Sequence, residues 1–380
     1  MARDMADSDS VSNGYCSFPL QGGRLGWGFS VGAPAFDPLP NPPPSRGREL
    51  EHTWQLQFPP HQPYDEGWLD VGDGHQIHWQ VSGHPGAPTA LFIHGGPGAG
   101  GTAADRRWFN PQRWRVVSFD QRGCGQSRAQ VLLHANTTPH LLADMEALRA
   151  HLGIQRWLLF GGSWGATLAL AYAQAHPQHV SGLVLRGVFT ATRAETCWLY
   201  GARGAAARHP QAWQRLCAAA GADVKAGVLD AMNHRLQAND QDALTAAHAW
   251  WAWEHDLMDA ESLLAHAPRA TVNDTHALAL ARIGVHYARN AWFLDEGQLL
   301  ANAARLHGIH GVIVQGQRDL ITPASAARAL HVAWPQAHLI EVASAGHASS
   351  HPGMARHLIH ATETMAATAE ETPHVRAQTA

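Results

Sequence analysis

The chain has 380 residues, a net charge of −4 and 45% hydrophobic residues, which is ordinary for a globular protein. This charge balance does not indicate a nucleic-acid-binding surface, and no run of about 18 apolar residues suggests a membrane span. The N-terminus lacks the apolar region of a secretory signal. The length suits one α/β domain with an insertion.

The four cysteines are Cys16, Cys124, Cys197 and Cys217. Their spacing does not match a zinc site, and we expect neither a metal nor another cofactor. We expect free thiols in a reducing compartment and therefore a cytoplasmic location.

Residues 1–50 differ in composition from the rest of the chain. They are rich in Gly, Pro and Ser and include the proline-dense stretch Pro38–Pro44. The segment has neither helical nor strand periodicity, which predicts a disordered leader. We favour an extension without a role over a linker or a partner-binding segment.

The first motif with chemical meaning follows the apolar run Thr89–Ile93, which predicts a buried strand. The chain then reads His-Gly-Gly-Pro-Gly from His94 to Gly98. A glycine-rich loop at a strand end brings backbone N–H groups close to a substrate. We expect the Gly96 N–H to bind the oxyanion that develops in acyl transfer. The alternative is an ordinary turn.

The second motif is Gly161-Gly-Ser163-Trp-Gly165, which follows an apolar run and precedes a small-residue helix ending at His176-Pro177. Strand, sharp turn and helix are the setting of a nucleophile elbow, so Ser163 is the predicted nucleophile. The Trp164 N–H would be the second oxyanion donor. The pattern alone occurs by chance in roughly one chain of this length in ten, so partners must support it.

The partners of such a serine are an acid and then a histidine, each following a strand. Gly311–Gln315 predicts a strand, and Asp319 lies in the turn after it. His338–Ala343 predicts the last strand, and His347 follows it on a small-residue loop. We predict that Asp319 orients the imidazole and that His347 accepts the serine proton.

Other candidates for these roles fit less well. Asp120 also ends a strand-like segment, but it precedes Ser163 and opens the tight loop Asp-Gln-Arg-Gly-Cys-Gly-Gln-Ser. The chain has 27 histidines, and His351, His357 and His360 fall on a predicted C-terminal helix. We interpret those three as surface or packing residues.

Between Val188 and Leu300 the alternation of strand and helix gives way to Ala-, Trp- and His-rich stretches with helical spacing. We predict a helical cap over residues 189–300 that excludes water and shapes the pocket. The core then comprises residues 51–188 and 301–365, and residues 366–380 form a flexible tail. Most of the cap tryptophans, Trp250, Trp251 and Trp253, are interpreted as packing residues.

Several segments resemble the proline iminopeptidase (prolyl aminopeptidase) family of the α/β-hydrolase fold over about residues 56–365. They are Tyr64–Asp70, Phe92–Gly98, Phe119–Gly125, Gly161–Gly165 with Leu168–Gln174, and Val184–Gly187. The resemblance implies a mostly parallel sheet with an inserted helical cap. It also implies release of N-terminal proline from peptides with a free N-terminus, through an acyl-enzyme on serine.

An aminopeptidase must recognise a cationic amine, which a carboxylate in the pocket does by charge-assisted hydrogen bonding. Trp253-Glu254 is similar to the Trp-Glu of the family's cap, whose glutamate anchors the amine. A solvated surface glutamate is the competing interpretation. Phe189 and Tyr200 match pocket aromatics of the family.

The chain departs from the family pattern in the cap. Gly284 stands where the family has a second glutamate, and Ala288 and Leu199 stand where aromatics are usual. We expect a wider pocket with weaker selectivity for proline. Asp256 and Glu296 are candidate replacements for the missing carboxylate.

Two other functions stay open. One is a related esterase or amidase with relaxed specificity, and the other is a non-catalytic ligand-binding protein on this fold. The complete Ser163, Asp319 and His347 set disfavours the latter, and a serine at 163 disfavours hydrolases with a carboxylate nucleophile. The sequence does not indicate an oligomeric state.

Overall fold

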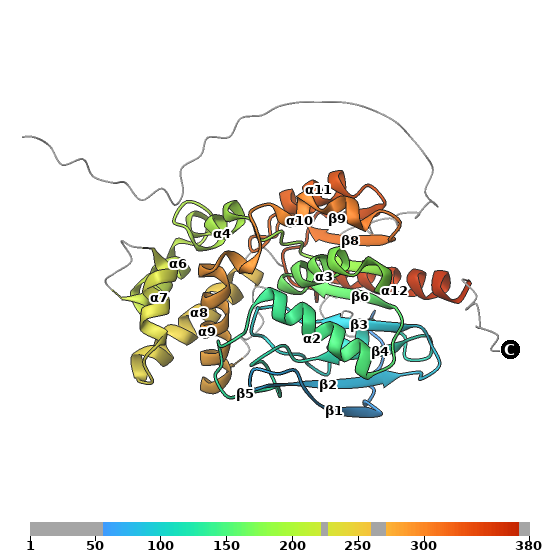
Figure 1. The fold of residues 1–380 in the computed structure, drawn as a ribbon. Coiled ribbons are helices and arrows are strands. Elements are labelled where there is room, and N and C mark those ends of the chain that lie inside the picture. Colours follow the sequence, from blue (N-terminus) through green and yellow to red (C-terminus); the bar gives the residue numbers. More distant parts are fainter. Residues whose placement is uncertain (1–55, 222–226, 260–270, 372–380) are drawn as a thin grey trace, which may run out of the picture. The chain divides into compact units, whose positions relative to one another are not determined.

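The computed structural model describes residues 56–221, 227–259 and 271–371 (Figure 1). Within these residues nine strands form one sheet in the order β1-β2-β4-β3-β6-β7-β8-β9, and β5 pairs with β2. The strands are β1 (Asp65–Asp70), β2 (His75–Gly83), β3 (Thr89–Ile93), β4 (Arg115–Phe119), β5 (Arg128–Ala129), β6 (Trp157–Gly162), β7 (Val180–Arg186), β8 (Gly311–Gly316) and β9 (Ala337–Val342). The predicted leader, residues 1–50, lies outside the described residues.

The sheet is parallel from β4 to β9, whereas β1, β2 and β5 pair antiparallel. The prediction of a mostly parallel α/β sheet is confirmed. Parallel strands end at the same edge of a sheet, so the loops after β3, β6, β8 and β9 meet there. The four sequence motifs lie on these loops.

Helices cover both faces of the sheet. In β6 all residues are buried; Leu159 packs in the same cluster as Leu168, and Phe160 faces the opposite cluster with Leu358. Successive strand residues point to opposite faces, so a strand covered on both sides reads as one apolar run. The first face is covered by α2 (Thr138–His151), α3 (Trp164–Ala175) and α11 (Ala324–Ala333), and the other by η1 (Asp105–Trp108) and α12 (Pro352–Glu371).

The short helix η2 (Pro177–His179) directly precedes β7. Between β7 and the next strand, β8, every regular element of the described chain is a helix. The elements are α4 (Arg193–Tyr200), α5 (Ala205–Arg208), α6 (Pro210–Ala220), α7 (Val228–Leu236), α8 (Gln241–Asp259), α9 (Asp274–Arg289), η4 (Ala291–Phe293), α10 (Gln298–Ala301) and η5 (Ala303–Leu306). In Figure 1, α6 to α9 gather at the left, away from α12. The boundaries 189–300 of the cap remain a proposal, and α10 crosses the second one. At the other end, α12 continues through Glu371, six residues into the segment proposed as a tail.

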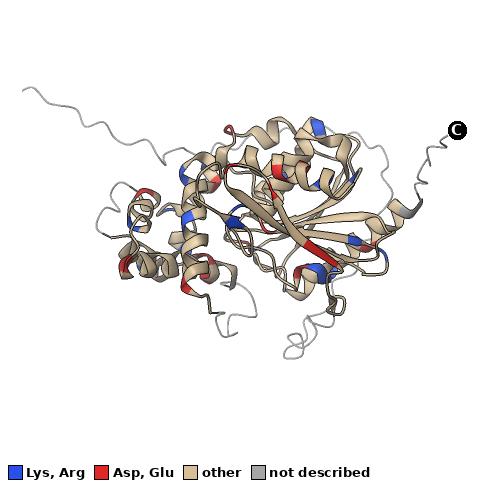
Figure 2. Ribbon diagram, turned by 60° about the horizontal axis from the view of Figure 1, so that its bottom comes forward, with Lys and Arg blue, Asp and Glu red and all other residues tan. Residues whose placement is uncertain are grey.

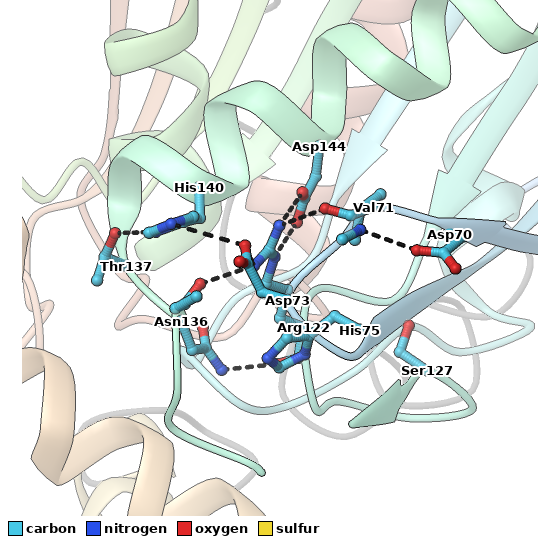
Figure 3. Close-up of polar contacts among 12 residues, drawn as sticks. Asp70, Val71, Asp73, His75, Arg122, Ser127, Asn136, Thr137, His140 and Asp144 are labelled. Atoms are coloured by element: carbon cyan, nitrogen blue, oxygen red, sulfur yellow. Dashed lines mark hydrogen bonds and ion pairs between the residues drawn. The ribbon is translucent and has the colours of Figure 1, made fainter. Parts of the chain in front are cut away.

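A buried polar network ties the loop after β4 to α2 and the cap. Arg122 donates from Nε and Nη2 to the carboxylate of Asp144, both at 2.7 Å, and its carbonyl accepts from Asn136 Nδ2 at 3.0 Å (Figure 3). The Tyr287 hydroxyl of α9 donates to Asn136 Oδ1 at 3.0 Å. The cap helix α9 is thereby anchored to the core beside the site described below.

Basic and acidic residues are interspersed along the described elements (Figure 2). Among these elements, no helix is both long enough and apolar enough to cross a bilayer. Cys124 and Cys217 are free, but the expectation of a free thiol is wrong for Cys197, which is disulfide-bonded. Cys16 lies outside the described residues. Composition cannot reveal such a bond because it depends on which side chains meet in space.

Candidate active site

Ser163 occupies the sharp turn between β6 and α3. Its backbone has φ 58° and ψ −126°, a conformation that L residues rarely adopt, and its N–H donates to the Arg186 carbonyl at 2.8 Å. The first and last glycines of the motif are needed for space: a Cβ on Gly161 would lie 2.2 Å from the Gly165 carbonyl oxygen, and one on Gly165 would lie 2.2 Å from the Ile93 carbonyl oxygen. The turn therefore holds the serine at the end of the strand, where it lines a cavity.

His347 and Asp319 meet beside this turn. The loop after β8 carries Asp319 and the loop after β9 carries His347, and Asp319 Oδ2 lies 2.7 Å from His347 Nδ1. With the proton on Nδ1, the Nε2 lone pair is available to the cavity, which both His347 and Ser163 line. The arrangement provides a hydroxyl, a base and an orienting carboxylate in one place.

The protonation states suit a general base. Burial lowers the pKa of His347, and the nearby Arg186 cation lowers it further, against the opposing effect of Asp319. Burial alone would raise the pKa of Asp319, but the charge and hydrogen bond of His347, with hydrogen bonds from Thr322, hold it below its ordinary value. At neutral pH the imidazole is therefore neutral and the carboxylate is ionised.

The sequence did not predict the residues that hold the Asp319 carboxylate. Its Oδ1 accepts the N–H groups of Ile321 and Thr322 at 2.9 and 2.8 Å, and Oδ2 accepts the Thr322 hydroxyl at 2.9 Å. Gln315 Nε2 lies 3.3 Å from the same Oδ2. A glutamine at the end of the apolar run Val-Ile-Val was the one available signal for Gln315.

Asp120, the rival acid, has other partners. Its carboxylate accepts the N–H groups of Gly101 at 2.7 Å and Gln126 at 2.8 Å, and it lies 3.7 Å from His78 Nδ1. It thereby fixes the loop after β3 against the loop after β4. The carboxylate next to His347 is that of Asp319.

The loop after β3 lies against the serine turn. A Cβ on Gly95 would be 3.3 Å from the Gly162 carbonyl oxygen and 3.7 Å from Ser163 Cβ, so the two loops are in contact. Gly96, Trp164 and Ser163 all line the cavity. Because Trp164 is the first residue of α3, its N–H has no acceptor within the helix. The predicted oxyanion donors are thus next to the predicted nucleophile.

The cavity has a volume of about 280 Å³ and lies between core and cap residues. All the residues predicted for substrate binding, Phe189, Tyr200 and Glu254, line it. The sequence did not predict the further lining residues Ala99, Arg186, Trp251, His255, Met258, His276, Leu280, Trp292, Ile321 and Thr322. These come from distant segments, which a single sequence does not place together.

Glu254 is partly exposed to this cavity and otherwise surrounded by protein. Among the described residues that line the cavity it is the one carboxylate. Its Oε1 accepts the Tyr200 hydroxyl at 2.9 Å, and Tyr200 stacks on Trp250 with ring centroids 4.8 Å apart. Burial raises the pKa of Glu254 to about 7, although the Tyr200 hydrogen bond partly offsets this. A cationic amine in the cavity would supply the charge partner that the carboxylate lacks.

Of the three positions where the chain departs from the family pattern, one lines the cavity and two do not. Leu199 lines the cavity, whereas Gly284 and Ala288 are not among its lining residues. A Cβ on Gly284 would lie 3.1 Å from Cζ2 and Nε1 of Trp250, so the indole fills the adjacent space. At Gly284 the pocket therefore does not gain the width expected from the sequence.

The two candidate replacements for the missing carboxylate lie elsewhere. Asp256 Oδ2 pairs with Arg215 at 2.6 Å, and Glu296 accepts the Arg193 N–H at 3.0 and 3.2 Å. Neither is among the lining residues of the cavity. The prediction that one of them replaces the second anchor finds no support in the structure.

Glu146, His176 and His179 bring three metal-type ligand atoms within 4.8 Å of one another, away from the cavity. Both Glu146 oxygens already accept from Arg149, at 2.9 and 3.0 Å, and Oε1 also lies 3.1 Å from His179 Nδ1. A guanidinium on both oxygens repels a further cation. We interpret the group as an ion-pair network.

Comparison with known proteins agrees with this geometry. Residues 88–353 match the alpha/beta hydrolase fold family. Proline iminopeptidases of Neisseria meningitidis serogroup A, Arabidopsis thaliana and Xylella fastidiosa Temecula1 are each 42% identical to this chain. The alignments cover 80%, 82% and 81% of this chain and 96%, 82% and 98% of the three relatives, in the same order. The chain belongs to the proline iminopeptidase family.

Solved structures support the fold of this family member. A probable hydrolytic enzyme from Pseudomonas aeruginosa PAO1 superposes with a TM-score of 0.53 at 20% identity, covering 80% of this chain and 94% of that one. An alpha/beta hydrolase enzyme from a Medee basin deep-sea metagenome library gives 0.51 at 16% identity, covering 80% and 96%. The predictions of the family and of the α/β-hydrolase fold are confirmed.

Proposed function

We propose that the protein is a serine aminopeptidase that releases N-terminal proline, and to a lesser extent other small residues, from peptides. The observation that carries the proposal is that Ser163, His347 and Glu254 line one cavity, with Asp319 hydrogen-bonded to the imidazole. The first three supply a nucleophile, a base and an anion for a free amine. Membership of the proline iminopeptidase family supports the same activity.

In the acylation step His347 Nε2 takes the proton of Ser163 as Oγ attacks the carbonyl carbon of the first residue. The carbonyl oxygen becomes an oxyanion, which accepts hydrogen bonds from the N–H groups of Gly96 and Trp164. The intermediate collapses when the C–N bond breaks and His347 gives its proton to the leaving amine. The proline is then an ester on Ser163.

Deacylation repeats this chemistry with water. His347 removes a proton from a water molecule, whose oxygen attacks the ester carbonyl, and then returns the proton to Ser163 Oγ as the ester bond breaks. Asp319 remains ionised throughout and stabilises the imidazolium, a role that fits its lowered pKa. Free proline leaves.

Specificity for the N-terminal residue rests on Glu254. An ammonium beside its carboxylate forms charge-assisted hydrogen bonds of about 1.5–3 kcal/mol each. The buried rings of Phe189 and Tyr200 give the prolyl ring an apolar wall. A residue inside a peptide has no ammonium group to bind Glu254, so peptides are cleaved after their N-terminal residue.

The second candidate is an esterase or amidase of relaxed specificity. It is favoured by Gly284, which has no side chain to act as a second amine anchor. With Glu254 as the one cavity carboxylate among the described residues, discrimination between amine and acyl substrates is smaller than with two. A non-catalytic binding protein would have no use for the paired Asp319 and His347.

A substrate panel separates these functions. The purified protein is assayed with prolyl, alanyl and acetyl-prolyl 4-nitroanilides and with 4-nitrophenyl acetate. An aminopeptidase cleaves the first fastest and leaves the acetyl-capped anilide intact, whereas comparable rates on capped and free substrates identify a broad amidase. Ser163→Ala should abolish turnover of every substrate that the wild type cleaves, without loss of the fold. Turnover that survives in this variant would place the nucleophile elsewhere.

A cytoplasmic location also remains a proposal. The free Cys124 and Cys217 are compatible with a reducing compartment, whereas the disulfide-bonded Cys197 weighs against one. Fractionation of the source cells, followed by thiol labelling of the native protein, would decide between a reducing and an oxidising compartment.

A further inference from the structure

Gln121 lies between the two segments that carry the predicted oxyanion donors. It follows β4 and is 1% exposed, so its side-chain amide must find partners within the protein. Its Nε2 donates to the His94 carbonyl at 2.9 Å, and its Oε1 accepts the Trp164 indole N–H at 2.9 Å. His94 begins the glycine loop after β3, and Trp164 directly follows Ser163.

The orientation of this amide follows from its partners. The indole N–H of Trp164 can only donate, and the carbonyl of His94 can only accept. The side chain of Gln121 must therefore present its oxygen to the indole and its nitrogen to the loop. One amide therefore joins the two loops.

A second connection runs through the imidazole of His94. The backbone N–H of Gln121 donates to His94 Nε2 at 3.0 Å, so the ring proton is on Nδ1, which donates to the Gly95 carbonyl at 2.9 Å. Burial lowers the pKa of His94, which keeps this neutral form. The Gly95 carbonyl and the Gly96 N–H belong to one planar peptide unit and point in opposite directions. A ring that fixes the carbonyl therefore aims the N–H.

We propose that Gln121 is a positioning residue that holds the Gly96 and Trp164 amides at the spacing needed for the oxyanion. This inference rests on the proposed serine chemistry of the same site. Gln121 does not itself touch the substrate, since it is not among the cavity-lining residues. It acts by holding the loop after β3 against the residue that follows Ser163.

The test is Gln121→Met, which keeps the length of the side chain and removes both of its hydrogen bonds. Displacing preorganised donors costs transition-state binding, so we expect kcat on prolyl 4-nitroanilide to fall about tenfold or more. KM should stay within about threefold, because Glu254 and the ring pocket are untouched. Binding of prolyl boronic acid, which forms a tetrahedral adduct on Ser163, should weaken about as much as kcat falls. Binding of pyrrolidine, which has the ring and the amine but no carbonyl, should not change.

Two further variants separate positioning from general stability. Trp164→Phe removes the indole N–H and keeps the backbone amide, and should also lower kcat; combined with Gln121→Met it should add little, because both cut the same link. Gln174→Met is the matched control: Gln174 is another buried glutamine, on α3, whose Nε2 donates to the Leu299 carbonyl at 2.7 Å. It should lower thermal stability without changing kcat.

The outcomes distinguish the two proposals. Folded Gln121→Met with wild-type kcat and boronate affinity would overturn the positioning role, as would equal weakening of boronate and pyrrolidine binding. If Gln121→Met does not fold, Trp164→Phe decides in the same way. If the wild-type protein hydrolyses 4-nitrophenyl acetate through Ser163 but not prolyl anilide, the aminopeptidase proposal fails and the comparison is made on the ester. A wild-type protein that hydrolyses neither overturns both.

Discussion

Replacing Glu254 by glutamine should make the protein more stable at alkaline pH and less active. Glutamine has the same shape and can still accept the Tyr200 hydroxyl, but it carries no charge into the cavity. Burial raises the pKa of Glu254 from 4.5 to about 7. At 1.36 kcal/mol per pKa unit, ionising the side chain in the folded protein costs about 3 kcal/mol, reduced to about 2 kcal/mol because the carboxylate is partly exposed.

The sign follows from the direction of the shift. The folded-state pKa is above the unfolded one, so the unfavourable contribution is absent below pH 4.5 and fully present once the pH has risen through 7. Between pH 5 and pH 8 the wild type should therefore lose stability that Glu254→Gln retains. For the roughly 300 described residues this corresponds to a Tm difference of about 3 °C at pH 8, and of less than about 1 °C at pH 5, where the difference has only begun to develop.

The measurements are thermal unfolding at both pH values and kinetics at pH 8. We expect kcat/KM on prolyl 4-nitroanilide to fall about 10- to 150-fold, the equivalent of 1.5–3 kcal/mol, with little change on 4-nitrophenyl acetate. The matched control is Asp256→Asn on the same helix, which pairs with Arg215 outside the cavity lining and should keep the wild-type substrate preference. Equal losses on both substrates would refute the amine-binding role, and identical Tm values at pH 8 would refute the buried-charge reasoning.

Three further variants test the supports of the site. Thr322→Val removes the hydroxyl donor to Asp319 Oδ2, a hydrogen bond worth about 1 kcal/mol, so kcat should fall about fivefold. The acidic limb of the pH–kcat profile should move to higher pH, because a carboxylate with one donor fewer stabilises the His347 imidazolium more strongly and raises its pKa. An unchanged pH–rate profile would contradict this. Gly187→Ala places a Cβ 2.9 Å from His347 Cε1 at a backbone φ of 55°, so kcat should fall about tenfold or more, and wild-type turnover would show that the ring adjusts freely. Asp144→Asn leaves the buried Arg122 charge without its carboxylate, at a cost of about 3–5 kcal/mol, and thermal unfolding should show a Tm lower by about 5 °C or more; a shift below 1 °C would mean that Asp73 compensates.

The sequence alone determined the fold family and the order of the predicted chemical groups. The apolar run before Gly161 predicted a strand, which the structure has at Trp157–Gly162, because a strand covered on both faces needs little but apolar residues. Glycines at 161 and 165 marked the sharp turn around Ser163 because no side chain fits there. These signals are local, so they can be recognised in a single sequence. Asp319 and His347 were then selected because each follows a later predicted strand in the expected order.

Only the tertiary structure decided which distant side chains meet. Asp319 and Asp120 both follow strands. Packing places the Asp319 carboxylate 2.7 Å from His347, whereas the Asp120 carboxylate accepts backbone N–H groups from two loops. The same holds for the Trp250 indole beside Gly284 and for the amide of Gln121 between two loops. Contacts between distant side chains depend on the whole folded chain, and hydrophobic periodicity shows which residues share a buried face but not which of them meet.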